Sequence, residues 1–243
     1  MTIKSKLSRI IVGAVAILLC ASYSHADLVL RLDDPAVGVG FDVVIVDNVG
    51  GTHPDSNPVL GAVTFIGTVG VWVVNVTTAL SKPLPPNSPS VAHIDLNSVN
   101  TSTGAGTLII QNTDENFQLV PFGINFRSNI GGTLAPGSLT YQEWMDFANV
   151  HFGMGGPTPG QLGPFAGPGA FSSTLTTVVP YGGQLFSLTE EVTLVHTAAG
   201  TSSFDAESHL EAVPEPASLL LLGSGLMGLS FLGRRKWAKG GKK

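Results

Sequence analysis

Cysteine is nearly absent from this 243-residue sequence. The single cysteine, Cys20, lies in an apolar N-terminal run that we expect to be removed, so the predicted mature chain contains none. A chain without cysteine forms no disulfides, and zinc sites built on thiolates are excluded from it. The body must therefore be held together by its hydrophobic core, or with help from bound ions.

Basic side chains are scarce between Asp27 and Ala212. This stretch carries Arg31, Lys82 and Arg127 against sixteen Asp and Glu residues, which gives it a formal charge of −13. An acidic body repels nucleic acid and anionic membrane surfaces, so we predict no nucleic-acid partner. The same charge keeps a secreted protein soluble, and it can also attract divalent cations.

The signatures of common catalytic sites are missing as well. The sequence contains no HExxH, GxSxG or Walker A motif, and no GxGxxG after a predicted strand. The histidines of the body are scattered, with no close pair at metal-ligand spacing: His53, His93, His151, His196 and His209. We therefore predict no catalytic residue, no metal ligand and no enzyme. A secreted hydrolase is the least favoured alternative, since the paired acids of a glycosidase meet only in the fold.

Short runs rich in Val, Ile, Thr and Phe recur along the body, separated by Gly, Pro, Asn and Asp, whereas helical patterns are scarce. Ten runs are predicted to be strands: Leu28–Leu32, Phe41–Asp47, Ala62–Ile66, Val69–Thr77, Val91–Val99, Gly106–Asn112, Phe117–Phe126, Ser173–Val179, Gln184–His196 and Ser203–Leu210. No βαβ alternation is present. The pattern predicts an all-β domain over residues 27–212, an antiparallel β-sandwich or jelly roll.

Three segments depart from this strand pattern. Ser138–Phe147 (SLTYQEWMDF) is predicted as a short helix capped by Ser138, with an aromatic strand as the alternative. Lys82–Pro89 carries four prolines in eight residues, and Gly153–Gly169 has eleven Gly or Pro among seventeen. We expect both of these segments to be surface loops, which is where binding function often lies.

Carboxylates between the first strands supply the candidate cation ligands. The five carboxylates are those of Asp33, Asp34, Asp42, Asp47 and Asp55, and Asn48 and Asn57 add amide oxygens. Calcium takes six to eight oxygen ligands, which such loop side chains can supply. We predict that the protein has no cofactor, with calcium binding as the alternative. Asp and Asn also populate turns, and the spacing lacks the EF-hand pattern. Asp114 and Glu115 form a second carboxylate pair.

Exposed aromatic residues would indicate sugar binding through ring stacking. Tyr141, Trp144 and Tyr181 are the surface candidates, with core packing as the default interpretation. Trp72 lies in an apolar strand and is predicted to belong to the core. Glu190 and His196 share one face of a predicted strand, which is an ordinary strand pattern.

Residues 1–26 have the organisation of a secretory signal peptide. A basic start precedes the eleven apolar residues Ile10–Cys20, a run too short for a normal membrane span. The small residues Ser24 and Ala26 then predict cleavage before Asp27. We expect the Sec translocon and signal peptidase to handle this segment.

The last 31 residues combine three features in a fixed order. The motif Val213, Pro214, Glu215 and Pro216 comes first; residues 217–233 are apolar; and residues 234–243 form a basic tail that begins with Arg234, Arg235 and Lys236. As a helix, the apolar run would be about 24–26 Å long, slightly short of a bilayer core. Basic residues after a span mark the cytoplasmic side, so we predict a single membrane span with a cytoplasmic C-terminus. The two prolines favour an extended, accessible approach to it.

These three features together resemble the PEP-CTERM sorting domain of Gram-negative bacteria, here residues 213–243. The resemblance implies recognition by an exosortase, a membrane cysteine protease or transpeptidase. It also implies release from the inner membrane and delivery to the cell surface or an exopolysaccharide matrix. An ordinary uncleaved anchor is the alternative. The body resembles uncharacterised β-rich domains that precede such tails, and this likeness brings no activity with it.

From these observations we predict an exported surface or matrix protein with a structural or interaction role. Exopolysaccharide is the expected partner class. The alternative is a carbohydrate- or calcium-binding adhesive module.

Overall fold

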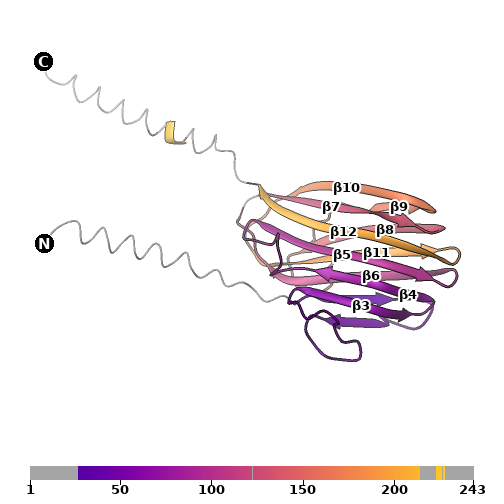
Figure 1. Cartoon of the computed structure of the whole chain (residues 1–243). Helices are drawn as coiled ribbons and strands as arrows, with labels where there is room; N and C mark the ends of the chain where they lie inside the picture. The colour runs from indigo at the N-terminus through magenta and orange to yellow at the C-terminus, as the bar shows by residue number, and fades with distance from the viewer. Residues whose placement is uncertain (1–26, 122, 214–222, 226, 228–243) are drawn as a thin grey trace, which may run out of the picture.

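Two antiparallel sheets make up the body of the protein (Figure 1). The computed structural model describes residues 27–121, 123–213, 223–225 and 227. The strands are β1 (Val29–Asp33), β2 (Val43–Val46), β3 (Ala62–Val69), β4 (Trp72–Leu80), β5 (Val91–Ser102), β6 (Gly106–Phe117), β7 (Gly123–Leu134), β8 (Gly137–Asp146), β9 (Leu162–Ala166), β10 (Gly169–Val179), β11 (Phe186–His196) and β12 (Gly200–Val213). The predicted all-β antiparallel sandwich is confirmed.

The strand order is that of a jelly roll with an extension. Sheet A has the order β2-β1-β6-β11-β8-β9, and sheet B has the order β10-β7-β12-β5-β4-β3. The pairs β5·β12, β6·β11, β7·β10 and β8·β9 are nested and alternate between the sheets, as in a long hairpin rolled up on itself. The hairpins β1–β2 and β3–β4 extend one edge of each sheet.

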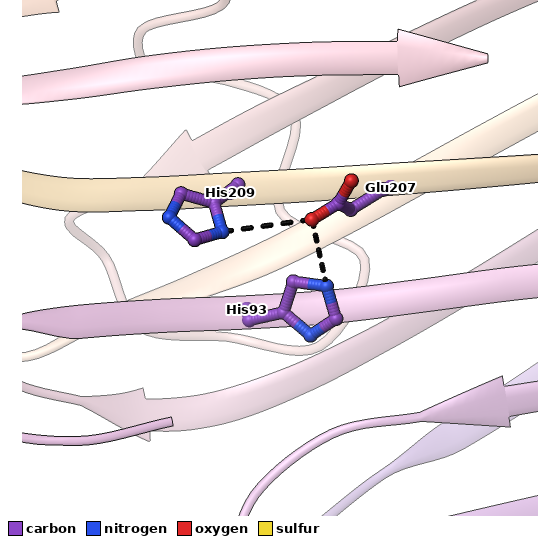
Figure 2. A group of neighbouring side chains, drawn as sticks. All are labelled: His93, Glu207 and His209. Atoms are coloured by element: carbon purple, nitrogen blue, oxygen red, sulfur yellow. Dashed lines mark ion pairs between the residues drawn. The ribbon is translucent and has the colours of Figure 1, made fainter. Parts of the chain in front are cut away.

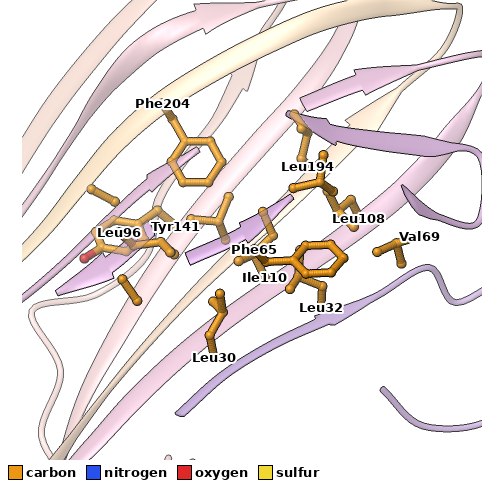
Figure 3. Close-up of a cluster of buried hydrophobic side chains, with 14 of the residues drawn as sticks. Leu30, Leu32, Phe65, Val69, Leu96, Leu108, Ile110, Tyr141, Leu194 and Phe204 are labelled. Atoms are coloured by element: carbon orange, nitrogen blue, oxygen red, sulfur yellow. The ribbon is translucent and has the colours of Figure 1, made fainter. Parts of the chain in front are cut away.

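Alternating side chains from both sheets fill the core (Figure 3). Leu30 and Ile110 come from sheet A, and Leu96 and Phe204 from sheet B. Trp72 is fully buried, as predicted. Each such side chain contributes about 1.5–3 kcal/mol through the area it removes from water, which is how a body without disulfides is stabilised.

A layer of polar side chains divides this core into two apolar clusters. On β12, for example, inward-facing Ser208 lies between Ala206 of one cluster and Leu210 of the other. Three more strands repeat the arrangement with Ser128, Glu143 and Glu190, and Asn112 of β6 completes the layer. All five side chains are fully buried. Burying polar groups without hydrogen bonds is costly, so this layer must be satisfied internally or by water.

The segment Ser138–Phe147 is where the sequence interpretation was wrong. It lies in β8 and pairs with β11 and β9, so the alternative of a strand is correct and the helix is not. Leu139, Tyr141, Glu143 and Met145 are buried at every second position, a period of two that a helix cannot produce. The polar Glu143 at an inward position had masked the alternation.

The two predicted loops are more ordered than expected. Gly153–Gly169 contains β9, which pairs with β8 at the edge of sheet A. Lys82, at the start of the proline-rich loop, is buried, and its Nζ lies 2.8 Å from Oδ1 of Asp114. A buried ion pair of this kind ties the loop to β6.

The predicted signal peptide and membrane span fall outside the described residues, apart from 223–225 and 227, which are helical. Within the described part of the chain, no helix has both the length and the apolar character that a membrane crossing requires. Val213, the first residue of the predicted sorting motif, is the last residue of β12 and pairs with Gly123 of β7.

Candidate functional site

The outer face of sheet A is partly covered by the chain that follows β8. Ser187 and Thr189 face outward on β11 but are fully buried. Ser187 donates a hydrogen bond to the carbonyl of Val150, and Phe152 packs on the guanidinium of Arg31 with a centroid distance of 3.4 Å. This part of the face is therefore closed to a partner, whereas the outward residues Glu191, Thr193 and Val195 farther along β11 are half-buried.

The outer face of sheet B is open and polar. Rows of outward side chains run across its central strands at half-buried or exposed positions. One row contains Arg127, His209 and His93, and the next contains Asn129, Glu207 and Asp95. Within the described strands this face carries no Trp, Tyr or Phe at the outward positions of β5, β7, β10 and β12. It is therefore suited to polar ligands rather than to ring stacking.

Two histidines and a glutamate converge on this face (Figure 2). His93 and His209 are directly opposite each other on β5 and β12, with ring centroids 5.9 Å apart. Glu207 lies two residues before His209 and therefore on the same face. Its Oε1 is 3.2 Å from Nε2 of His93 and 3.6 Å from Nδ1 of His209. Among the described residues, this is the group of three such side chains whose ligand atoms come within 4.8 Å of one another.

Burial and neighbouring groups shift the pKa values of His93 and Glu207 in this cluster. Burial lowers the pKa of His93, against the opposing effect of Glu207. Burial alone would raise the pKa of Glu207, but the hydrogen bond from Asn129 and the nearby His93, Arg127 and His209 bring it below its ordinary value. At neutral pH the arrangement is an ionised carboxylate beside a neutral imidazole, which are the forms that bind metal ions.

A group of acids adjoins the cluster. Asp95 lies opposite Glu207 in the strand register. Burial, with Asp205 and Glu207 nearby, raises the pKa of Asp95 to about 7. Asp95, Asp205 and Glu207 thus place acidic groups side by side on the outer face of β5 and β12.

The aspartates considered for calcium accept hydrogen bonds from the backbone of the first loops. Asp34 accepts hydrogen bonds from the backbone N–H groups of Ala36 and Val71, and Asp47 accepts one from Gly61 at 2.7 Å. Asp55 accepts hydrogen bonds from the N–H groups of Asn57 and Thr64. These carboxylates thus hold the loop backbone in place through contacts within turns, as at Ala36 and Asn57, and through contacts between segments, as at Val71 and Gly61.

The other sequence candidates are separated by the fold. Asp114 is fully buried against Lys82, whereas Oε1 of Glu115 lies 3.2 Å from Nδ1 of His151. Tyr141 is fully buried and Tyr181 is nearly so, so the default of core packing is correct for both and they are not surface residues. Trp144 is half-buried on the outer side of sheet A.

Glu190 and His196 do share the inward face of β11, as predicted. His196 Nδ1 and Nε2 lie 2.7 Å from the hydroxyls of Ser102 and Ser202, and its ring packs on Trp72 at 4.6 Å. His196 is therefore a satisfied core histidine.

A pair of acids lies inside the sandwich. The hydroxyl of Tyr141 is 2.8 Å from Oε2 of Glu143 and 2.7 Å from Oε1 of Glu190. Burial raises the pKa of Glu143 to about 8 and that of Glu190 well above its ordinary value. Both side chains are completely buried, so this pair has no access to a substrate.

The sequence interpretation missed the cluster of His93, Glu207 and His209. The two strands that carry it are far apart in the chain, and their antiparallel register brings His93 beside His209. One signal was available: Glu207 and His209 are two positions apart in a predicted strand, so they share a face.

Comparison with known protein families decides the nature of the C-terminal segment. The model of the PEP-CTERM protein-sorting motif matches residues 212–236. The chain carries a PEP-CTERM sorting motif. The match includes Val213–Pro216 and Arg234–Lys236 and begins inside β12. A PEP-CTERM motif implies an exported, surface-sorted protein, here one with a β-rich body.

No curated protein matches the chain. Among solved structures, it is similar to the enzymatically active domain of bacteriophage CBA120 tailspike protein 4, at 12% identity and a TM-score of 0.30; the match covers 60% of this chain and 20% of the tailspike. The K1 cleaved adhesin domain of Lys-gingipain from Porphyromonas gingivalis W83 matches at 12% identity and a TM-score of 0.28; the match covers 63% of this chain and 99% of the adhesin domain. A carbohydrate-binding module described for specific mannan recognition matches at 12% identity and a TM-score of 0.26; the match covers 63% of this chain and 99% of the module. Scores this low support no statement about the function of the PEP-CTERM protein.

Proposed function

We propose that this protein is an exosortase substrate that is delivered to the cell surface or an exopolysaccharide matrix, where its β-sandwich has a structural or interaction role. In this proposal, a signal peptide over residues 1–26 directs export. Residues 217–233 hold the chain in the inner membrane until processing, with Arg234, Arg235 and Lys236 on the cytoplasmic side. Val213, Pro214, Glu215 and Pro216 form the recognition motif.

The observation that carries the proposal is the sorting motif placed directly after the central strand of sheet B. β12 is hydrogen-bonded to β5 and β7 along its length, and its last residue is Val213. Cleavage within the motif would therefore leave a complete folded body, with almost no tail attached to it. The strong negative charge of the body is consistent with a soluble surface protein.

The test is the substitution Glu215→Ala in a host that contains an exosortase. We expect the variant to remain in the membrane fraction with its C-terminal segment attached, because the acidic residue of the motif is lost. Glu211→Ala is the matched control: Glu211 is exposed on β12 and lies just outside the matched segment. Normal processing and delivery of Glu215→Ala would contradict the proposal.

A second candidate is carbohydrate binding by the outer face of sheet B. The observation in its favour is the open array of carboxylate, amide and hydroxyl groups on this face, in contrast to the partly covered face of sheet A. For example, Asp205 is exposed beside Asn97, and Thr101 is hydrogen-bonded to Thr201. Such groups bind polymer hydroxyls through hydrogen bonds rather than through stacking.

A further inference from the structure

We propose that His93, Glu207 and His209 form a zinc site on the outer face of sheet B. This inference does not rest on the proposed function, since it concerns the folded body alone. Each residue supplies one ligand atom, and two imidazoles with one carboxylate make up a common zinc-binding set.

The two distances from the carboxylate to the imidazoles fit a zinc ion, and all three ligand atoms lie within 4.8 Å of one another. Tetrahedral coordination with bonds of about 2.0–2.1 Å places ligand atoms roughly 3.3–3.5 Å apart. Oε1 of Glu207 lies 3.2 Å from Nε2 of His93 and 3.6 Å from Nδ1 of His209. Small rotations of the side chains would therefore be enough to bind the metal.

The position of each ligand is fixed by the fold. The antiparallel pairing of β5 and β12 places the two histidines side by side. Oε2 of Glu207 accepts a hydrogen bond from Nδ2 of Asn129, which leaves Oε1 directed at the imidazoles (Figure 2). Such outer partners orient metal ligands and are part of a working site.

One ligand atom lacks a hydrogen-bond partner. Nδ1 of His209 is buried and has no hydrogen bond, with Oε1 of Glu207 3.6 Å away. A buried polar atom without a partner is costly, and a metal ion would satisfy it. The side chains of His93, Glu207 and His209 are still 13%, 32% and 18% exposed, so an ion and a water ligand can reach the site.

The donor set determines which cation fits. Calcium and magnesium prefer oxygen ligands, whereas imidazole nitrogens favour zinc and its neighbours among the transition metals. Three protein ligands leave one position for water or for a ligand from outside, which is an open zinc site.

Arg127 opposes metal binding and provides a diagnostic variant. Its Nη2 lies 3.7 Å from Oε1 of Glu207, and its side chain is 43% exposed. Zinc must displace this cation from the carboxylate, and an exposed guanidinium can turn toward solvent. Removing it should therefore strengthen zinc binding, an effect that a purely structural role for the cluster would not produce.

The experiment is calorimetric titration of the full-length protein, in detergent and freed of metal, with zinc chloride. We expect one zinc ion per chain. Glu207→Gln and His209→Ala should each weaken binding at least about tenfold, since loss of even an outer-shell partner costs that much. Arg127→Gln should tighten binding. His53→Ala and His151→Ala are the histidine controls outside the cluster and should bind zinc as the wild type does.

Two further measurements make the result unambiguous. Melting curves without zinc check that each variant is folded. Zinc should raise the melting temperature of the wild type more than that of Glu207→Gln at the same zinc concentration, because stabilisation by a ligand falls as its dissociation constant rises. Absence of zinc binding by the wild type would overturn the proposal. So would unchanged binding by Glu207→Gln and His209→Ala, or equal loss in His151→Ala.

Discussion

At the scale of single residues, one buried group restricts which of its acids can be ionised. It consists of Tyr141, Glu143 and Glu190. One phenolic hydrogen lies between two carboxyl groups, at 2.8 and 2.7 Å. The hydroxyl can donate to only one of them, so the other must be protonated and donate in turn. Burial in the sandwich favours the neutral form of both acids, in agreement with their raised pKa values.

Stability should therefore fall as the pH rises. The native pKa of Glu143, about 8, lies above its ordinary value of 4.5, so the native state holds more protons than the unfolded state between these values. Its contribution is complete below about pH 4.5 and is lost as the pH rises through 8, by up to about 1.4 kcal/mol per pH unit. We expect the melting temperature of the wild type to decrease between pH 5 and pH 9.

Glu143→Gln should flatten this decrease, because an amide cannot ionise. Melting followed by circular dichroism across the pH range gives the slope. Glu211→Gln, at an exposed position on β12, should retain the wild-type slope. A wild-type melting temperature that stays constant or rises toward pH 9 would show that the buried acids do not titrate as described.

At the scale of the element, alternation of apolar residues was a good guide wherever the inward positions were apolar. Leu28–Leu32 and Val91–Val99 are examples, and both lie within or next to observed strands. The rule failed at β8, where inward Glu143 belongs to the polar layer and breaks the pattern. It also failed at β9, whose Gly and Pro content is typical of a loop. Edge strands tolerate proline, and β9 lies at the edge of sheet A.

The candidate site could be predicted less well, because it depends on pairing between distant strands. The spacing of Glu207 and His209 predicts a shared face, but nothing local places His93 opposite them. The aspartates of the first loops, which the sequence offered as calcium ligands, accept hydrogen bonds from the backbone N–H groups of other segments, and spacing along the chain does not reveal these contacts.

Carbohydrate binding by the outer face of sheet B can be tested with paired substitutions on each sheet. Asn97→Ala combined with Asp205→Ala removes two cross-strand neighbours from the open face of sheet B. Thr140→Ala with Thr193→Ala is the matched pair on the outer side of sheet A. In gels containing matrix polysaccharide, the first double variant should lose most of its retardation and the second should not. Equal retardation of both would exclude the outer face of sheet B as the binding surface.

At the scale of the whole molecule, the two ends of the body meet at one end of the sandwich. The N–H of Asp27 donates a hydrogen bond to Asp114 near the end of β6, and Val213 pairs with Gly123 at the start of β7. A short loop joins β6 to β7, so both proposed processing sites lie on the same side of the body. The strands from β1 to β12 are complete between them, which agrees with a mature chain that needs neither terminal segment to keep its fold.

Intact mass spectrometry of the native protein, fractionated into membrane, surface and medium, tests the central claim most directly. The account predicts a species that starts at Asp27, ends within Val213–Pro216, and is found at the surface or in the medium. A species that still ends at Lys243 in the inner membrane would contradict it and would make the C-terminal segment a plain anchor.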